Sequence, residues 1–341
     1  MNATILVTGG AGFIGSNYVR FVLREYPECR VINLDKLTYS GNLENLKDIA
    51  GDARYEFVHG DIADESVVAP LVDRADFVVN FAAESHVDRS IRDPKVFLRT
   101  NIDGPHVLLE AARNSGVTRF LQVSTDEVYG EVLTGQSDEG DPLAPRSPYA
   151  ASKAGGELLA RSYFVTYDIP VLITRGSNTI GPYQYPEKVV PLFITNAIDD
   201  QPLPIYGPGT AVRDYIHVDD HCRGIDQVLH HGEPGEVYNI GADNEVNTLE
   251  LAAAILAELG KPDSLVRHVT DRPGHDQRYS VKTQKLRRLG WATTSTFQTT
   301  LARTISWYRE NEWWWRPIKE GEYKKWYDQH YGLSDNDARM E

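Results

Sequence analysis

The sequence predicts an α/β fold, a doubly wound parallel sheet with a smaller C-terminal α/β domain. Apolar, strand-like segments alternate with segments of helical periodicity through the first half of the chain, which is the pattern of repeated β–α units. A glycine-rich turn follows the first of these strands. From about residue 175 the segments shorten and prolines become frequent, which indicates a second, smaller domain interleaved with late strands of the sheet.

The first unit of the sheet begins with a short apolar run and the turn "TGGAGFIG". Gly9, Gly12 and Gly15 give the spacing G-x-x-G-x-x-G, and apolar residues recur at helical spacing after Gly15. A second strand, "RVINLD", ends at Asp35. Strand, glycine turn, helix, strand and acid together form the fingerprint of a Rossmann-type dinucleotide site. The glycines let the backbone approach a pyrophosphate, and the start of the helix supplies N–H donors.

Asp35 distinguishes between the two nicotinamide dinucleotides. Its carboxylate can accept hydrogen bonds from the ribose hydroxyls of the adenosine, whereas it would repel a 2′-phosphate. Lys36 stands next to it and partly offsets that repulsion. We therefore predict NAD rather than NADP as the cofactor.

The next two strands bring small and polar residues to the same edge of the sheet. "YEFVHGDI" ends at Asp61 and Ile62, where a side chain can reach the adenine. "VVNFAA" runs into Ala82 and Ala83, whose small side chains let a dinucleotide lie against the strand end. Ligands of doubly wound sheets bind at the carboxyl ends of the strands. The same rim should hold Thr125, which ends the strand "RFLQVST".

The strongest chemical signal follows that strand, where Thr125 leads directly into Asp126 and Glu127. Two adjacent carboxylates at the mouth of a strand are costly to bury, and folding does not need them. The helical segment "SPYAASKAGGELLARSY" places Tyr149 and Lys153 four residues apart, on one face. A nearby ammonium, with an oxidised nicotinamide, would lower the phenol pKa from its ordinary value of about 10. These five residues are the predicted catalytic residues, with Thr125 bonded to the same substrate hydroxyl as the phenol.

The composition limits the partners. Of the 341 residues, 41% are apolar and 25% are charged, which is typical of a soluble globular enzyme. The net charge of −14 argues against nucleic acid as a partner, and we find no apolar run long enough to span a membrane. Cys29 and Cys222 have neither metal-ligand nor redox spacing, so we predict no metal and free thiols. The first residues enter a strand at once, so we expect no signal peptide and a cytoplasmic location.

Longer motifs extend over nearly the whole chain. They are "GGAGFIG", "YAASK", "DKLTYSGN" (35–42), "AAESHVDRSI" (82–91), "STDEVYG" (124–130), "GPYQYPEK" (181–188), "PLPIYGPGTAVRDYIHVDDH" (202–221) and "DRPGHDQRY" (271–279). The short motifs are typical of the extended short-chain dehydrogenase/reductase family. Together the motifs resemble those of the dTDP-glucose 4,6-dehydratase family, for which the acid pair in this setting is the most specific signal.

The resemblance implies a set of contacts for each ligand. For NAD it implies Gly9, Gly12, Phe13, Ile14, Gly15, Asp35, Lys36, Leu37, Thr38, Asp61, Ile62, Phe81, Ala82, Ala83, Ser85, Thr100, Tyr149, Lys153 and Thr179. For the nucleotide-sugar it implies Ser85, Thr125, Asp126, Glu127, Asn178, Lys188, Val189, Pro204, Ile205, Tyr206, Arg213, Thr248, Arg272 and His275. Arg213 and Arg272 suit a diphosphate because a guanidinium forks onto two oxygens, and Tyr206 would stack on the base. We assign no chemical role to His86 or His275.

The resemblance also gives the acid pair a task. A 4,6-dehydratase oxidises the sugar at C4, eliminates water across C5 and C6, and reduces C6, so that its tightly bound NAD is regenerated. Tyr149 would take the C4 hydroxyl proton, Glu127 would remove the C5 proton, and protonated Asp126 would donate to the departing C6 hydroxyl. Repulsion between adjacent acids can keep one neutral and the other charged. The expected reaction converts dTDP-glucose to dTDP-4-keto-6-deoxyglucose, for deoxysugar biosynthesis.

The chain accordingly divides into an NAD-binding Rossmann domain at residues 1–175 and a nucleotide-sugar-binding domain at residues 176–332. The segment "WYRENEWWWRPIKEGEYKKWYDQHYG" should form an aromatic-anchored helical cap, and residues 333–341 a frayed tail. The helix that begins near Tyr149, together with "NIDGPHVLLEAARNSG", would form a homodimer through a four-helix contact, as in the family.

The sequence departs from the family pattern at two places. Thr179 and Ile180 stand where asparagine and tyrosine are usual, so Thr179 cannot supply the amide that would hold the nicotinamide side. Thr248 replaces an expected asparagine, with Asn247 beside it. These changes would loosen the grip on cofactor or nucleotide, or mark a different nucleotide.

Three alternative functions stay open. A CDP- or UDP-glucose 4,6-dehydratase would share the chemistry and differ only at the base. A nucleotide-sugar C4 epimerase would share the glycines, Asp35, Thr125, Tyr149 and Lys153, but would not need the acid pair. A non-catalytic NAD-binding protein would tolerate the loss of Tyr149 or Lys153, and both are present.

Overall fold

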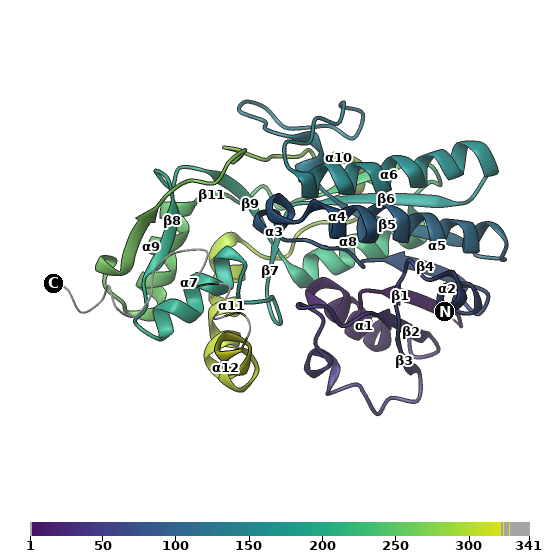
Figure 1. Cartoon of the computed structure of the whole chain (residues 1–341), viewed down its shortest axis with the longest axis horizontal. Coiled ribbons are helices and arrows are strands. Elements are labelled where there is room, and N and C mark those ends of the chain that lie inside the picture. Colours follow the sequence, from purple (N-terminus) through teal and green to yellow (C-terminus); the bar gives the residue numbers. More distant parts are fainter. Residues whose placement is uncertain (1, 322, 324–326, 328–341) are drawn as a thin grey trace.

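A seven-stranded, wholly parallel sheet forms the larger of two lobes in the computed structural model, which describes residues 2–321, 323 and 327 (Figure 1). The strand order is β10-β6-β5-β4-β1-β2-β3. The strands are β1 (Thr4–Thr8), β2 (Arg30–Asp35), β3 (Tyr55–His59), β4 (Phe77–Asn80), β5 (Arg119–Thr125), β6 (Val171–Gly176) and β10 (Val237–Ile240). Because β1 pairs with both β2 and β4, the direction in which the sheet grows reverses there, which is where such sheets bind ligands.

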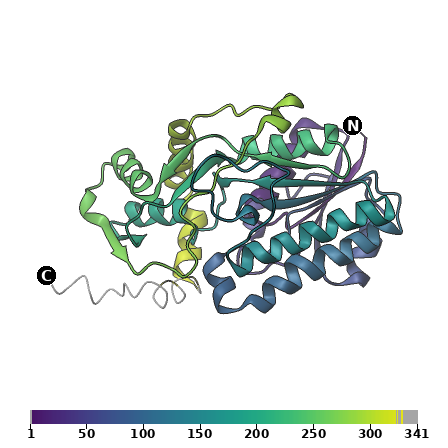
Figure 2. The same ribbon diagram turned by 90° about the horizontal axis from the view of Figure 1, so that it is seen from above.

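Helices cover both faces of this sheet, as the view in Figure 2 shows. One face packs against α1 (Phe13–Glu25), α8 (Val218–His231) and α10 (Gln284–Arg288). The other packs against α2 (Glu65–Val72), α5 (Gly104–Arg113) and α6 (Pro148–Tyr167). Short helices lie in the connecting loops, namely η1 (Leu43–Leu46), α3 (Val87–Arg92), α4 (Pro94–Leu98), η2 (Arg99–Asp103) and η3 (Asp126–Tyr129). Strand residues alternate between the two cores, with Leu121 in one and Phe120 in the other.

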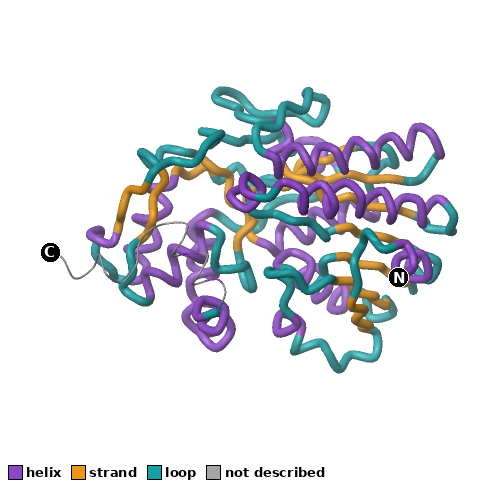
Figure 3. Tube along the Cα trace, viewed as in Figure 1, coloured by secondary structure: helices purple, strands orange, loops and turns teal. Residues whose placement is uncertain are grey.

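The smaller lobe combines short strands with helices. In Figure 3, where all strands are orange, these strands lie apart from those of the parallel sheet. Its sheets contain β7 (Asn178–Ile180), β9 (Val212–His217) and β11 (Glu245–Asn247), and β8 (Leu203–Tyr206) with β12 (Val266–Val269). Its helices are α7 (Val189–Ile198), α9 (Thr248–Leu259), η4 (Asp263–Leu265), α11 (Phe297–Glu310) and α12 (Glu312–Glu320). A separate core of buried side chains from α7, α9, α11 and α12 holds this lobe together.

The chain passes more than once between the lobes. It leaves the large sheet at Gly176 and returns to it with α8, β10 and α10. The elements α8, β10 and α10 follow residue 175 in the chain but pack with the larger lobe. A domain boundary at residue 175 therefore stays a prediction. The predicted frayed tail at residues 333–341 lies outside the described residues, as does part of the predicted helical cap.

Helix α12 reaches back from the smaller lobe to the glycine-rich turn. The buried Trp314 donates from Nε1 to Oδ1 of Asn45 at 2.7 Å, and Asn45 donates from Nδ2 to the carbonyl of Ala11 at 2.8 Å. The guanidinium of Arg20 lies 4.4 Å from the ring centre of Tyr183. These contacts join the two lobes beside the turn. Within the described residues, none of the helices is both long and apolar enough to cross a membrane.

A buried ion pair fastens α6 to the sheet. Arg175 on β6 donates from Nε to both carboxylate oxygens of Glu157 on α6, at 3.0 and 3.1 Å. The two side chains are only 4% and 3% exposed. Arg175 also donates from Nη1 to the hydroxyl of Tyr129 at 2.6 Å, which in turn donates to Asn239 at 2.8 Å. This network fixes the helix that carries Tyr149.

Glu157→Gln is expected to lower the free energy of unfolding by about 3 kcal/mol, because it leaves a buried guanidinium without its counter-charge. Urea unfolding followed by circular dichroism measures the change. The matched control is Glu312→Gln, which removes an exposed pair with Arg316 and should cost less than about 1 kcal/mol. Equal losses in the two variants would contradict a structural role for the buried pair.

Candidate active site

One pocket follows the carboxyl ends of β1, β2, β4, β5 and β6 and opens toward the smaller lobe. It is lined by every predicted cofactor residue except Leu37. Of the residues predicted to bind the nucleotide-sugar, it is lined by Ser85, Thr125, Asp126, Glu127, Asn178 and Lys188. The pocket thus brings the glycine turn, the acid pair and the Tyr–Lys helix together.

The glycine turn is shaped for close approach of a ligand backbone. Gly9 has φ of +70°, and a Cβ atom there would lie 2.7 Å from the Cα of Ala82, just past the end of the neighbouring strand β4. Gly12, which has no side chain, forms the N-cap of α1, so the amides of the first turn face the pocket without a side-chain partner at the cap. This cradle fits the pyrophosphate of a dinucleotide.

Asp35 lies at the adenosine end of the pocket and is buried. Its Oδ2 accepts from the amide of Ala11 at 2.9 Å, and its Oδ1 accepts from the amide of Leu37 at 2.8 Å. Burial raises its pKa, and the two backbone hydrogen bonds oppose that shift. Each oxygen keeps a lone pair for a ribose hydroxyl. Leu37 packs against the core beside α1 instead of lining the pocket.

Lys36 does not act as a free cation beside Asp35. Its ammonium pairs with Oδ2 of Asp61 at 2.8 Å, and Arg99 approaches the same oxygen at 3.3 Å. The positive charge that weakened the argument for NAD is therefore already matched by a carboxylate. The arrangement around Asp35 fits an adenosine ribose without a 2′-phosphate.

Asp35→Ala is expected to weaken NAD binding about tenfold or more, because it removes hydrogen bonds to a charged acceptor and leaves two buried amides unpaired. Titration calorimetry with cofactor-free protein measures the effect. The affinity for dTDP should stay at the wild-type value, since Asp35 is not among the residues predicted to bind the nucleotide-sugar. Unchanged NAD affinity would mean that the dinucleotide fingerprint is misread.

The acid pair begins the short helix η3. Thr125 caps that helix by accepting from the amide of Glu127 at 3.3 Å, and its hydroxyl donates to Oδ1 of Asp126 at 3.3 Å. Asp126 is 3% exposed. Asp126 Oδ2 and Glu127 Oε2 are both buried atoms with no hydrogen-bond partner among the described residues. Two orphaned carboxylate oxygens at the pocket wall are what a site awaiting a polar ligand would present.

The two carboxyls differ in their charged neighbours. Burial raises the pKa of Asp126 to about 8, and the charge of Glu127 adds to that shift. Burial also raises the pKa of Glu127, but the cations of Arg272, Arg213 and Lys188 oppose it. At neutral pH the pair therefore favours a protonated Asp126 beside a charged Glu127.

Tyr149 and Lys153 lie on the buried face of α6, next to the acid pair. Lys153 donates from Nζ to the carbonyl of Val123 at 2.6 Å, and burial lowers its pKa to about 8. Burial raises the pKa of Tyr149, the charge of Glu127 raises it further, and a hydrogen bond with Thr125 opposes the shift. Lys153 is not one of the groups that shift the pKa of Tyr149 in the structure. Its predicted lowering of that pKa therefore stays a prediction.

Several residues predicted to bind the nucleotide-sugar meet at a carboxylate that the sequence did not point to. Tyr206 donates from its hydroxyl to Oδ2 of Asp88 at 3.1 Å, and Arg272 approaches Oδ1 of Asp88 at 3.3 Å. The ring of His275 lies edge-on to Tyr206, with centroids 6.0 Å apart. Arg213 donates to the carbonyl of Asp276 at 2.9 Å. These residues lie outside the lining of the pocket, but Arg213 and Arg272 are close enough to act on Glu127.

The other predicted sugar-nucleotide residues have structural contacts. Ile205 on β8 is fully buried in the core of the smaller lobe, and its contact with the nucleotide-sugar stays a prediction. Pro204 precedes it on the same strand, and Val189 is the first residue of α7. Thr248 donates to the carbonyl of Ala211 at 3.3 Å. Asn247 caps α9 by accepting from Glu250 at 2.9 Å, so it does not stand in for the missing asparagine.

The pocket also has lining residues that the sequence did not single out. They are Leu34, Tyr39, Ser40, Gly41, Gly60, Glu84, Val123, Ser124, Gly176, Ser177, Gln184, Tyr185, Glu187 and His221. Tyr39 to Gly41, Glu84, Ser124 and His221 belong to motifs quoted above, so the motifs carried the signal even where no role was assigned.

Comparison with known proteins places the chain in a family. Residues 6–304 match the family model described as GDP-mannose 4,6 dehydratase. A dTDP-glucose 4,6-dehydratase from Streptomyces niveus is 52% identical, over 92% of this chain and 95% of that protein. The low-salt glycan biosynthesis protein Agl12 from Haloferax volcanii is 49% identical, over 89% and 98%.

Solved structures agree with this assignment. The dTDP-glucose 4,6-dehydratase DesIV from Streptomyces venezuelae, crystallised with NAD, matches with a TM-score of 0.91 and 52% identity, over 93% of this chain and 100% of that one. A UDP-glucuronic acid 4-epimerase from Bacillus cereus, also with NAD, matches with a TM-score of 0.86 and 28% identity, over 90% and 99%. The predicted Rossmann-type fold and the predicted resemblance are confirmed. The chain belongs to the GDP-mannose 4,6 dehydratase family.

Proposed function

From this family membership and the acid pair, we propose that the chain is an NAD-dependent dTDP-glucose 4,6-dehydratase, a hydro-lyase that forms dTDP-4-keto-6-deoxyglucose. The observation that carries the proposal is the adjacent pair of buried Asp126 and half-buried Glu127, placed beside Tyr149 at one end of a dinucleotide-shaped pocket. Relatives about half identical to this chain bear that name.

The residues of the pocket fit NAD. The glycine turn, which is too tightly packed for a side chain at Gly9 or Gly15, and the start of α1 would hold the pyrophosphate, and Asp35 would hold the adenosine ribose. Bound NAD would accept hydride from C4 of the sugar and return it to C6. Because the hydride removed from C4 would return to C6 of the same sugar, the reaction would consume no NAD.

The side chains of this protein would move the protons. Tyr149 takes the proton of the C4 hydroxyl as a phenolate, the form that the positive charge of an oxidised nicotinamide would favour, and Thr125 bonds the same hydroxyl. The C4 ketone then acidifies the C5 proton, which charged Glu127 removes. Protonated Asp126 gives its proton to the C6 hydroxyl, which leaves as water. When hydride is delivered to C6, Glu127 returns a proton to C5, which completes the 4-keto-6-deoxy sugar. The cations near Glu127 oppose the rise of its pKa and so favour its charged form, and the burial of Asp126 favours its neutral form, so each carboxyl is biased toward the state that its step requires.

The same geometry weighs against the alternatives. A C4 epimerase performs one oxidation and its reversal, and needs neither a second base nor an acid at C6. A non-catalytic NAD-binding protein would have no use for adjacent carboxyls whose buried oxygens Asp126 Oδ2 and Glu127 Oε2 have no hydrogen-bond partner among the described residues, because such atoms cost stability. A CDP- or UDP-glucose dehydratase would use identical chemistry, and the choice of dTDP rests on the named relatives.

We also propose a homodimer and a cytoplasmic location. Helix α6 exposes large apolar side chains at Leu158, Val165 and Tyr167, which suits the predicted four-helix contact with α5. The cytoplasmic assignment rests on Cys29 and Cys222, which are free and buried.

The test incubates purified protein with dTDP-glucose and no added cofactor. We expect the alkaline absorbance of a 4-keto sugar and a product lighter by one water, without net NADH. Parallel incubations with CDP- and UDP-glucose decide the nucleotide. No product from any of the three, even with added NAD, would put the epimerase ahead.

A further inference from the structure

His221 lies at the end of the pocket that holds the reacting groups. Its ring packs on Gly176, where a Cβ atom would come within 2.5 Å of the ring carbon Cε1 and 2.7 Å of Nε2. Gly176 is the register partner of Thr125 across β5 and β6. Neighbouring strands are about 4.8 Å apart, so the imidazole packs on the residue that lies directly beside Thr125 in the sheet. Gly176, Thr179 and His221 all line the pocket.

The imidazole is held on one side only. Its Nδ1 is 2.6 Å from the hydroxyl oxygen of Thr179, which is itself 3.2 Å from the carbonyl of Ser177. The other ring nitrogen, Nε2, is buried and has no hydrogen-bond partner within the described residues. His221 is 2% exposed. A buried imidazole nitrogen at a pocket wall needs a partner, and the pocket is where a ligand can supply one.

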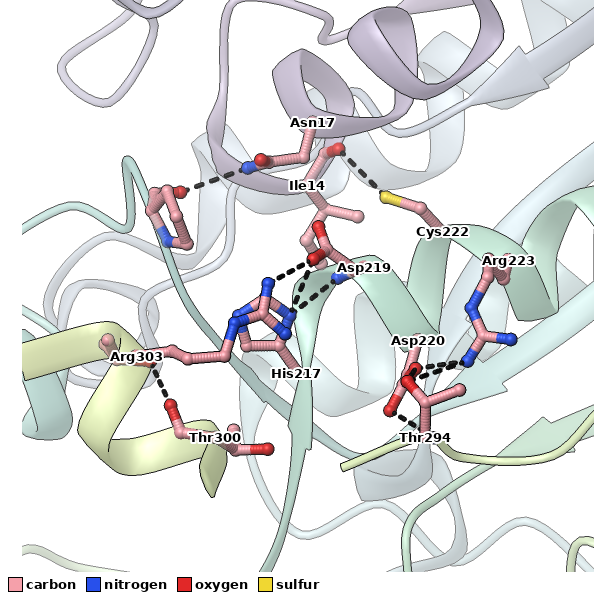
Figure 4. Close-up of polar contacts among 12 residues, drawn as sticks. Ile14, Asn17, His217, Asp219, Asp220, Cys222, Arg223, Thr294, Thr300 and Arg303 are labelled. Carbon is pink, nitrogen blue, oxygen red and sulfur yellow. Dashed lines mark hydrogen bonds and ion pairs between the residues drawn. The ribbon is translucent and has the colours of Figure 1, made fainter. Parts of the chain in front are cut away.

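The first turns of α8, which carry His221, are fixed on several sides (Figure 4). Asp219 pairs with Arg303 of α11 at 2.7 Å, and Asp220 accepts from the hydroxyl of Thr294 at 2.7 Å and also bonds Arg223. Cys222 contacts the carbonyl of Ile14, at the start of α1, with its sulfur at 3.9 Å. These contacts leave the imidazole little freedom to turn away from the pocket.

We propose that His221 is a cofactor-contacting residue whose Nε2 hydrogen-bonds the carboxamide of the nicotinamide, and that Thr179 is the positioning residue that orients its ring. The inference rests on the proposed function in one respect, that the pocket binds a nicotinamide dinucleotide. Hydride transfer at a sugar held by Thr125 and Tyr149 requires the nicotinamide at this end, while Asp35 marks the adenosine end.

The chemistry of the pair suits a carboxamide. Burial lowers the pKa of His221 to about 4, so the ring is neutral at physiological pH and carries one N–H. The carboxamide offers both an N–H donor and a carbonyl acceptor, so it can satisfy Nε2 in either tautomer. Thr179 has no amide in its side chain, but it thus still contributes to nicotinamide binding by orienting the ring of His221.

The experiment compares the affinities of cofactor-free protein for NAD and for ADP-ribose, which lacks the nicotinamide, by titration calorimetry. In His221→Phe we expect NAD to bind about three- to tenfold more weakly, the worth of one hydrogen bond, and ADP-ribose to bind as in the wild type. Thr179→Val should show the same selective loss, and Thr179→Ser, which keeps the hydroxyl, should restore NAD affinity.

The control is His217→Asn, which alters a buried histidine at the N-cap of α8 that does not line the pocket and should leave the ratio of the two affinities unchanged. An unchanged ratio in both His221→Phe and Thr179→Val would overturn the proposal. So would equal losses for both ligands, because they would indicate general damage to the pocket. If the wild type bound ADP-ribose but not NAD, the proposed function itself would fail.

Discussion

Glu127→Gln is expected to lower the rate of 4-keto-6-deoxy sugar formation by about 100- to 10,000-fold, the range that a general base contributes. The amide keeps the shape of the side chain but cannot take the C5 proton. The buried, partnerless Oε2 and the three cations that favour a charged Glu127 are the features that make this residue the base. NAD affinity should stay close to the wild-type value, because Glu127 is assigned to the sugar and is not among the residues predicted to hold NAD.

Two readouts test this role separately from folding. In deuterated water the wild type should place deuterium at C5 of the product, and mass spectrometry of the recovered sugar should find none from Glu127→Gln. The matched control is Glu131→Gln, four residues along the same segment, whose carboxylate pairs with Arg146 and does not line the pocket. That variant should turn over substrate at close to the wild-type rate. Full activity of Glu127→Gln would remove Glu127 from the mechanism.

The larger lobe was predictable because its signals are local. The turn from Gly9 to Gly15 requires glycine for steric reasons that the spacing alone expresses, and Asp35 follows within the same βα unit. Tyr149 and Lys153 share a helix face by a fixed period. Once the strands are parallel, their carboxyl ends meet at one edge, so Thr125 and the acid pair had to join the cofactor residues there.

The contacts that the sequence did not reveal depend on long-range returns of the chain. His221 reaches the end of β6 because α8 comes back from the smaller lobe to the large sheet. No hydrophobic periodicity in the nearby sequence predicts that return. Asp88 binds Tyr206 and Arg272, which follow it by more than 100 residues. The motif of Ile205 likewise did not reveal that its strand pairs with β12 or that its side chain belongs to the core of the smaller lobe.

The electrostatic roles of the acid pair and of Lys153 could be predicted from the sequence, but the groups that act on them could not. The sequence indicated that two adjacent acids would hold unequal charge. The structure adds the cause, which is the position of Arg213, Arg272 and Lys188 around Glu127. In the same way a lysine four residues after Tyr149 suggested direct action on the phenol, whereas its ammonium is bonded to the carbonyl of Val123. The sequence shows which residues carry a charge, but only the fold shows which charged side chains lie close to one another.

Asp126→Asn is expected to reduce water loss from the sugar by about 100- to 10,000-fold, since the amide cannot donate a proton to the C6 hydroxyl. Its expected signature differs from that of Glu127→Gln. The C4 ketone and the C5 base are untouched, so deuterium should still enter C5 of the recovered dTDP-glucose while little water is lost. Loss of both exchange and elimination would instead assign Asp126 to proton removal and overturn the division of labour.

The pH dependence follows from the burial that raises the pKa of Asp126 to about 8. An acid whose pKa is raised holds its proton below that value and releases it above, so the rate of dehydration should fall as the pH rises through about 8. Because Asp126 and Glu127 interact, the observed limb belongs to the pair. Rates at saturating dTDP-glucose between pH 6 and about 9.5 measure it, and the residual rate of Asp126→Asn should lack the alkaline fall. A wild-type rate that stays level through this range would mean that the general acid is another group.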